Sequence, residues 1–192
     1  MRTVEIRRHA ERDANEDLTA KGREQCVRAR ETLEFPYDAY VISPAKRSRL
    51  TMDAFGIHTA KVHDGLAPRP RGEFARYDRR HEELMRDGED AVTAWFAIPE
   101  CVPLLLEHGR RALAAVLGIA AKLPEGGRAL AVSHGGTIEP LAVVASGRAY
   151  DVLFGGEELG HCEGVRAMFV DAEVRRIDVI RFSHARTDPS PP

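Results

Sequence analysis

The stretch R-A-L-A-V-S-H-G-G, at residues 128–136, decides how the chain is expected to fold. Its first six residues form a short apolar run, which is typical of a strand buried in a sheet. The glycines then lead into a segment over about 137–147 that we interpret as a helix. A strand that runs directly into a helix is a building unit of layered α/β folds.

Strands and helices alternate on both sides of this stretch. Four further strands are expected at residues 3–7, 38–42, 164–170 and 174–182, the last two as a hairpin. Helices are expected over 19–34 with Thr19 as N-cap, after Ser43-Pro44, and over 89–123 with breaks near Pro99 and Pro103. The apolar face of the last helix is predicted to contain Leu106, Leu113, Val116, Leu117, Ala120 and Leu123. The alternation indicates an α/β layered fold with a mixed sheet.

The chain has 192 residues, which is the size of one domain with a small insertion. We expect a single domain over residues 1–185, with a cap insertion at 63–105 and a loose tail at 186–192. Apolar residues make up 43% and charged residues 30%, as in ordinary globular proteins. The 28 basic and 30 acidic residues give a net charge of -2, which disfavours a general nucleic-acid binder.

Membrane insertion and export are not expected from the sequence. The longest run without charged side chains, Ala112 to Ala121, is short of the roughly 20 residues that cross a bilayer. Charged residues such as Arg2 and Glu5 stand where an export signal needs apolar residues. The three cysteines are an odd and widely spaced set, which disfavours a disulfide framework and favours the reducing cytoplasm.

Cationic and nucleophilic side chains follow three of the expected strands. The first strand ends in Arg8-His9, the second runs into Ser43-Pro44-Ala45-Lys46-Arg47, and the apolar strand ends in Ser133-His134. Ligands of open α/β sheets bind at the carboxyl ends of the strands. A lone histidine or arginine at such a place is most often an ordinary loop residue. Together, the two histidines and two arginines predict a small pocket for a phosphate group.

These residues also carry a family resemblance. R-H-A-E at 8–11 resembles the R-H-G-E signature of the histidine phosphatase superfamily, the phosphoglycerate-mutase-like proteins. L-T-A-K-G at 18–22, S-P-A-K-R at 43–47 and S-H-G-G at 133–136 are similar to its other motifs, in the same order. The resemblance implies a three-layer α/β/α sandwich with a mostly parallel, mixed sheet and a small cap insertion.

The resemblance also implies roles for individual residues. His9 would be the nucleophile, and Arg8, Arg47 and His134 would bind the phosphoryl oxygens. Asn15, six residues after His9, and Gly135 would contribute further hydrogen bonds, although Asn15 fits a loop or helix-cap role equally well. Ala10 stands where the family usually has glycine, so that position must tolerate a Cβ atom.

The chemistry of phosphoryl transfer fits these roles. The transferred group needs in-line positioning and neutralisation of charge on its oxygens, and guanidinium groups match its geometry. An imidazole attacks only when it is neutral, and the positive charges of Arg8 and Arg47 should keep His9 neutral. The cycle is then covalent and has two steps. Because the cations are side chains, we expect no metal and no cofactor.

The leaving oxygen needs a proton, which a glutamate commonly supplies in this family. Glu73 is the candidate, with Glu82 and Glu83 as fallbacks, and an ordinary exposed glutamate is an equal alternative for Glu73. Pro68 stands where one form of the family motif has its acid. Some phosphohistidine phosphatases of the superfamily lack this acid, so its absence would bear on the substrate.

The function expected is a metal-independent phosphatase acting on small phosphate monoesters through a phosphohistidine intermediate. A protein phosphohistidine phosphatase and a non-catalytic phosphate-binding module are the alternatives, and mutase activity is disfavoured because the chain has little room for long insertions. The expected partner is a small phosphorylated substrate, with no nucleic acid and no membrane. The sequence specifies neither the substrate nor the oligomeric state.

Three other features of the sequence are given ordinary interpretations. His161-Cys162-Glu163 is taken as a surface turn, since no second pair of ligands stands at zinc-like spacing. Trp95-Phe96 is expected to pack in the core or the cap. The basic segment interleaved with acidic residues is interpreted as a solvated face, and a rim that attracts an anionic substrate is the alternative; its arginines are Arg69, Arg71, Arg76, Arg79, Arg80 and Arg86.

Overall fold

The computed structural model describes residues 1–70, 72–171 and 173–182. Its described residues form a six-stranded sheet in the order β3-β2-β4-β1-β5-β6. The strands are β1 (Arg2–Arg8), β2 (Ala39–Ile42), β3 (Lys61–Val62), β4 (Arg128–Ser133), β5 (Gly164–Val170) and β6 (Glu173–Ile180). The first four are parallel, whereas β5 is antiparallel to both β1 and β6. The expected mixed sheet with a late hairpin is confirmed, and β3 is an edge strand that the sequence did not predict.

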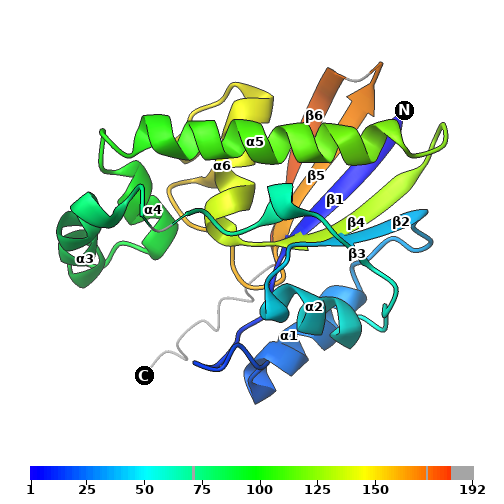
Figure 1. The fold of residues 1–192 in the computed structure, drawn as a ribbon, viewed down its shortest axis with the longest axis horizontal. Coiled ribbons are helices and arrows are strands. Elements are labelled where there is room, and N and C mark those ends of the chain that lie inside the picture. The colour runs from blue at the N-terminus through cyan, green and yellow to red at the C-terminus, as the bar shows by residue number, and fades with distance from the viewer. Residues whose placement is uncertain (71, 172, 183–192) are drawn as a thin grey trace, which may run out of the picture.

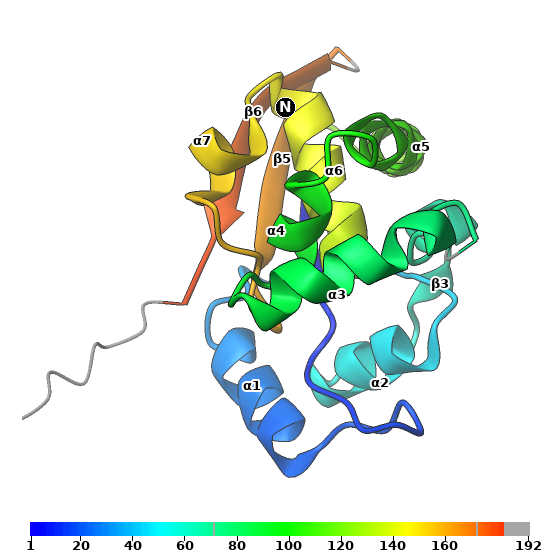
Figure 2. The same ribbon diagram turned by 90° about the vertical axis from the view of Figure 1, so that its left-hand side faces the viewer.

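Helices cover both faces of the sheet (Figure 1). One face carries α1 (Ala20–Arg30) and α2 (Lys46–Ala54), and the other carries α5 (Val102–Ala121) and α6 (Gly135–Ser146). The arrangement confirms the three-layer sandwich. The expected cap contains η1 (Asp64–Leu66), η2 (Ala75–Tyr77), α3 (Asp78–Arg86) and α4 (Ala91–Phe96). Helices α3 and α4 lie beyond the end of the sheet (Figure 1 and Figure 2), whereas η1 lies beside α5 and its Leu66 packs in the core of the sheet. A further short helix, α7 (Tyr150–Phe154), precedes β5.

Successive side chains of β4 point to opposite faces of the sheet, so the strand contributes to two separate cores. Ala129 and Ala131 pack with the residues of α5 and α6, whereas Leu130 and Val132 pack with those of α1 and α2. A third and smaller cluster, centred on Phe74, Trp95, Ile98, Cys101 and Leu105, holds the cap elements together. Trp95 therefore packs in the cap, as expected. The tail expected at 186–192 lies outside the described residues.

The charged side chains on one face of β1 form a buried ion pair. Glu5 and Arg7 are almost fully buried, and their carboxylate and guanidinium groups meet at 2.7 Å. Arg166 adds a second cation at 2.9 Å from Glu5, and Arg7 also donates to the hydroxyl of Thr32 and the carbonyl of Cys162. Buried charges are tolerated when they are paired and hydrogen-bonded. A strand with charged residues on one face can thus occupy the middle of the sheet.

Local signals explain where the helices begin. The hydroxyl of Thr19 accepts a hydrogen bond from Gly22 N at 2.9 Å, which is the predicted N-cap of α1. Pro103 lies in the first turn of α5 and starts this helix, where a break was expected. Helix α6 begins at Gly135, two residues before the expected start, directly after His134. Among the described residues, no helix is long and apolar enough to cross a membrane.

The buried face of α5 agrees in part with the predicted one, since Val116, Ala120 and Leu123 are buried as expected. Leu105, Ala112 and Ile119 point into the core, whereas Leu106 and Leu113 are only half-buried. The reason is close packing against α6, because a Cβ atom on Gly109 would clash with the carbonyl of Pro140. A glycine at this contact lets the two helix backbones approach, and this approach sets the rotation of α5.

Candidate active site

The carboxyl ends of three parallel strands bring the predicted side chains together. The backbone N–H of His9 donates to Ser133 O at 2.9 Å, and that of Ser43 donates to Val132 O at 3.0 Å. These bonds hold the ends of β1, β4 and β2 side by side, on the side of the sheet where α3 and α4 lie (Figure 1). The imidazole rings of His9 and His134 consequently lie with their centres 5.3 Å apart.

A cavity of about 390 Å³ opens at this point. Its wall contains five of the residues expected in a phosphate site, namely Arg8, His9, Arg47, His134 and Gly135. The cap completes the wall with the apolar side chains of Ala91, Val92, Trp95 and Leu105. A concave site with apolar walls and a few convergent polar groups is the usual form of a small-molecule site.

His9 is held in one tautomer by its own neighbour. Its Nδ1 atom lies 2.8 Å from the carbonyl oxygen of Ala10. A carbonyl can only accept, so Nδ1 carries the proton and Nε2 keeps a free lone pair. The methyl group of Ala10 is fully buried in the core beneath α1 and α2, and its N–H donates to the hydroxyl of Thr51. The site thus accommodates the Cβ atom that replaces the usual glycine.

Both ring nitrogens of His134 are engaged. Nδ1 accepts from Nε of Arg47 at 3.2 Å, and Nε2 lies 2.8 Å from Oγ of Ser43. Because a guanidinium only donates, the ring proton of His134 must sit on Nε2 and point to Ser43. Ser43 in turn donates to Ser48 at 2.7 Å. The serine of S-P-A-K-R therefore fixes the orientation of the second histidine.

Burial keeps both imidazoles neutral. It is the largest cause that lowers the pKa of His9 to about 3, with the charges of Arg47 and Arg8 adding to the effect. Burial likewise lowers the pKa of His134 to about 2, again with help from Arg47. The sequence analysis expected the charges of the two arginines to keep His9 neutral. Desolvation lowers the pKa of His9 more than these charges do.

Arg8 and Arg47 each have a carboxylate partner. Nη1 of Arg8 bonds to Glu158 at 2.8 Å and to the carbonyl of Leu159, and Arg47 pairs with Glu16. Nε of Arg8 is buried and has no hydrogen-bond partner among the described residues. A buried donor without a partner costs free energy unless a ligand supplies an acceptor.

The family model of the histidine phosphatase superfamily (branch 1) matches residues 4–154. The chain belongs to this superfamily. The match covers all four motifs and the elements that carry the cavity, from β1 to α7. No curated protein was found to match the sequence.

Solved structures of the superfamily share the fold. Phosphoserine phosphatase from Entamoeba histolytica, in complex with 3-phosphoglyceric acid, is 16% identical with a TM-score of 0.68, covering 96% of this chain and 99% of that one. Mycobacterial glucosyl-3-phosphoglycerate phosphatase is 20% identical with a TM-score of 0.68, covering 95% and 100%. Phosphoglycerate mutase from Bacillus anthracis is 16% identical with a TM-score of 0.63, covering 93% and 92%. Phosphatases and a mutase of the superfamily thus have this architecture.

Two of the expected site residues lie away from the cavity wall. Asn15 is exposed, and its backbone carbonyl accepts from Lys46 at 3.3 Å. Glu73 is exposed in the turn before η2, and the fallbacks Glu82 and Glu83 are exposed on α3. The roles expected for these residues stay predictions.

Three residues of the site were not assigned to it from the sequence, and a fourth, Arg69, was named only through the alternative of a rim that attracts an anionic substrate. Arg12, Arg69 and Glu158 line the cavity, and the ring of His161 lies 5.7 Å from that of His9. His161 and Glu158 come from the segment between α7 and β5, which carries no motif. The turn expected around His161 is present, but it is not on the surface, because Cys162 and Glu163 are buried and His161 adjoins His9. Burial lowers the pKa of His161 to about 4.

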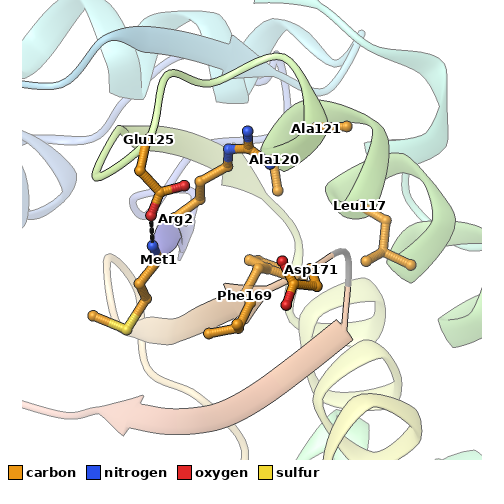
Figure 3. Close-up of a pocket in the computed structure, with 9 residues that line it drawn as sticks. Met1, Arg2, Leu117, Ala120, Ala121, Glu125, Phe169 and Asp171 are labelled. Carbon is orange, nitrogen blue, oxygen red and sulfur yellow. Dashed lines mark hydrogen bonds and ion pairs between the residues drawn. The ribbon is translucent and has the colours of Figure 1, made fainter.

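Two further features of the described residues concern alternative sites. No group of three or more His, Cys, Asp or Glu side chains in the described ranges is arranged to hold a metal ion. A smaller hollow of about 140 Å³ lies at the opposite end of β1, between Met1, Leu117 and Phe169 (Figure 3). Its walls contain none of the motif residues, so we place the chemistry in the larger cavity.

Proposed function

We propose that this protein is a phosphatase that hydrolyses small phosphate monoesters through a phosphohistidine at His9, with no metal. The observation that carries the proposal is the unprotonated Nε2 of a buried, neutral His9 in a cavity that also contains Arg8 and Arg47. A lone pair beside two guanidinium groups matches what phosphoryl transfer needs.

In the first step, Nε2 of His9 attacks phosphorus, and the bond from phosphorus to the leaving oxygen breaks. Arg47 and the unpaired Nε of Arg8 supply donors for the phosphoryl oxygens. The N–H groups at the start of α6, at Gly135, add the positive end of a helix dipole. The imidazole becomes positively charged, and the carbonyl of Ala10 stabilises this charge through Nδ1–H.

In the second step, water attacks the same phosphorus atom and the phosphorus–nitrogen bond breaks. Its electron pair returns to Nε2 of His9, and inorganic phosphate leaves. One proton of the water ends on the alcohol and the other on phosphate or solvent, so the net reaction is ester hydrolysis.

The test combines turnover with trapping. With p-nitrophenyl phosphate and an excess of chelator, the wild type should release p-nitrophenol, and His9→Ala should lose at least about 10³-fold in kcat. Rapid denaturation during turnover should yield a phosphoryl label that is stable to alkali, labile to acid and absent from His9→Ala. His58→Ala, at an exposed histidine of the surface, serves as the matched control. Equal activity of wild type and His9→Ala, or a label on another residue, contradicts the proposal.

A second candidate, a protein phosphohistidine phosphatase, is favoured by one observation. Glu158 is the only carboxylate in the described cavity wall, and it is already engaged by Arg8 and by the N–H of Val92 at 3.1 Å. A phosphorus–nitrogen bond to an imidazole needs less help from an acid than an ester of an alkyl alcohol does. Release of phosphate from a phosphohistidine carrier protein, without turnover of alkyl phosphates, would select this candidate.

A further inference from the structure

The loop of residues 155–163, between α7 and β5, holds Arg8 at its backbone and at its side chain. The backbone N–H of Arg8 donates to Glu163 O at 2.7 Å, and that of Cys162 donates to Arg8 O at 3.0 Å. Nη1 of Arg8 bonds to the carboxylate of Glu158 at 2.8 Å and to a backbone carbonyl of the same loop. Arg8 therefore depends on the 155–163 loop for both its position and its direction.

Arg181, directly after the end of β6, holds this loop in place. Its Nη1 donates to Glu158 O at 2.6 Å, and its Nη2 donates to Glu157 O at 2.7 Å and to Phe154 O at 3.1 Å. The carboxylate of Glu163 also lies 3.1 Å from Nη1. A planar guanidinium group can serve all these acceptors at once, because its N–H donors are fixed in one plane.

The carboxylate of Glu163 connects Arg181 to the base of the loop. It accepts from Gly160 N at 2.7 Å and from Phe182 N at 2.9 Å, and only 3% of Glu163 is exposed. A buried carboxylate is tolerated when a cation and hydrogen bonds compensate it, and Arg181 supplies that cation. Loss of this cation should disturb the loop at the residue whose carbonyl binds the backbone of Arg8.

The other end of the loop sets the direction of the Arg8 side chain. Glu158 is fixed from the cap, since its N–H donates to Asp90 at 2.7 Å and its carboxylate accepts from Val92 N at 3.1 Å. With Nη1 of Arg8 bonded to Glu158, the Nε atom of Arg8 lies at the start of α6, where a Cβ atom on Gly135 would be 3.4 Å away. This Nε has no hydrogen-bond partner among the described residues, so it is available to a ligand.

We propose that Arg181 is a positioning residue for phosphoryl binding, because it fixes the loop whose Glu158 directs Arg8 at the bound group. The inference rests on the proposed function, since it takes Arg8 as a donor to the phosphoryl oxygens. None of the four motifs contains Arg181 or Glu158. The end of the last strand thus acts on the cavity through the loop, without touching the substrate.

The test is the affinity of the intact protein for orthovanadate, measured by titration calorimetry. This oxyanion adopts the geometry of the phosphoryl-transfer transition state, so it probes the binding site without turnover. Arg8→Ala should raise the Kd by about 10- to 100-fold, which is what a charge-assisted hydrogen bond contributes. Arg181→Gln should raise it by about 5- to 30-fold, because Arg8 remains but is no longer directed.

A double-variant cycle assigns the effect to Arg8. In the Arg8→Ala background, Arg181→Gln should change the Kd by less than about twofold, because the donor that Arg181 positions is gone. In the Arg47→Ala background it should keep its full factor, since Arg47 comes from α2 and pairs with Glu16. A merely structural role of Arg181 would weaken binding by the same factor in both backgrounds.

Two further variants complete the series. Arg181→Lys keeps a charge for Glu163 but lacks the planar fork, so its effect should lie between the wild type and Arg181→Gln. The same cycle is run with Arg181→Lys if Arg181→Gln does not fold. Arg176→Gln is the matched control, because this exposed arginine of β6 pairs with Asp178. It should keep the wild-type Kd within about twofold.

The outcomes separate this inference from the proposed function. Wild-type affinity in the Arg181 variant, or an equal loss in the Arg8→Ala and Arg47→Ala backgrounds, overturns the role of Arg181. A wild type that binds orthovanadate but hydrolyses no phosphate ester contradicts the proposed function, and the affinities still decide the role of Arg181. A wild type that binds no orthovanadate contradicts both.

Discussion

Nε of Arg47 donates a hydrogen bond to Nδ1 of His134 across 3.2 Å, so a guanidinium group of the cavity wall dictates the tautomer of this histidine. The ring proton is thereby directed to Ser43, which in turn is bonded to Ser48. Positions far apart in the sequence thus form one hydrogen-bonded chain from the cavity wall into the buried start of α2.

This chain makes Ser43 a positioning residue with a measurable effect. Ser43→Ala removes the acceptor for Nε2–H of His134, and a misplaced ring should lower kcat by about 10- to 100-fold. Ser48→Ala is the control, because Ser48 is equally buried but contacts Ser43 and not the histidine. It should lose less than about threefold. Equal losses in the two variants would indicate that the hydroxyls act only through packing.

The neutral state of the two imidazoles can be observed directly. The pKa of His9 is lowered to about 3 and that of His134 to about 2, whereas an unperturbed imidazole has a pKa of about 6.5. At pH 5, nitrogen NMR of the labelled protein should show both rings unprotonated, with the proton on Nδ1 of His9 and on Nε2 of His134. A charged ring at either position at pH 5 would overturn this prediction.

Glu139 should impose a pH dependence on stability. It is fully buried behind the start of α6, one carboxyl oxygen accepts from Leu159 N at 3.0 Å, and burial raises its pKa to about 8. The folded protein therefore retains a proton that the unfolded chain releases near pH 4.5. Stability should fall as pH rises from about 4.5 to about 8, by at most about 1.4 kcal/mol per pH unit.

Glu139→Gln isolates this effect, because the amide oxygen can still accept from Leu159. Urea unfolding of wild type and variant at pH 5, 6.5 and 8 should show their difference in free energy growing with pH in favour of the variant. A difference that is constant across this range would show that Glu139 is ionised in the folded protein throughout.

Glu73 provides a test of where the leaving-group proton comes from. Because Glu73 is exposed and outside the cavity wall, Glu73→Gln should change kcat by less than about threefold for both alkyl and aryl phosphates. Glu100→Gln, at an exposed glutamate of the cap that pairs with Arg80 and does not line the cavity, is the matched control. A loss confined to alkyl phosphates would assign proton donation to Glu73, as its place in the sequence predicts.

The sequence predicted that Arg8, His9, Arg47 and His134 meet in one cavity, because each of them ends or follows a short strand. Arg8, His9 and His134 stand at or directly after the ends of β1 and β4, and parallel strands that neighbour each other must bring such residues together. Arg47 lies in the first turn of α2, and this helix begins a few residues after the end of β2. The local sequence pattern and the topology of the sheet were sufficient to predict where these residues lie.

The rest of the cavity depends on contacts that no local pattern encodes. Arg69 is placed by Phe74 and Trp95, which lie on separate cap elements, and its conformation follows from their packing. Glu158 lies in the segment between α7 and β5, and its ion pair with Arg8 holds it in place. The buried face of α5 was predicted only in part for the same reason, since the rotation of this helix is set by the contact of Gly109 with α6.

Gly164 begins β5 opposite Arg7, where a Cβ atom would collide with the carbonyl oxygen of Ile6. Strands β5 and β1 are consequently in very close contact at Gly164. The segment from 155 to 163 precedes this contact, and it places Glu158 in the cavity wall and the ring of His161 beside that of His9. A side chain at position 164 would therefore push β5 away from β1 and displace the loop that pairs Glu158 with Arg8.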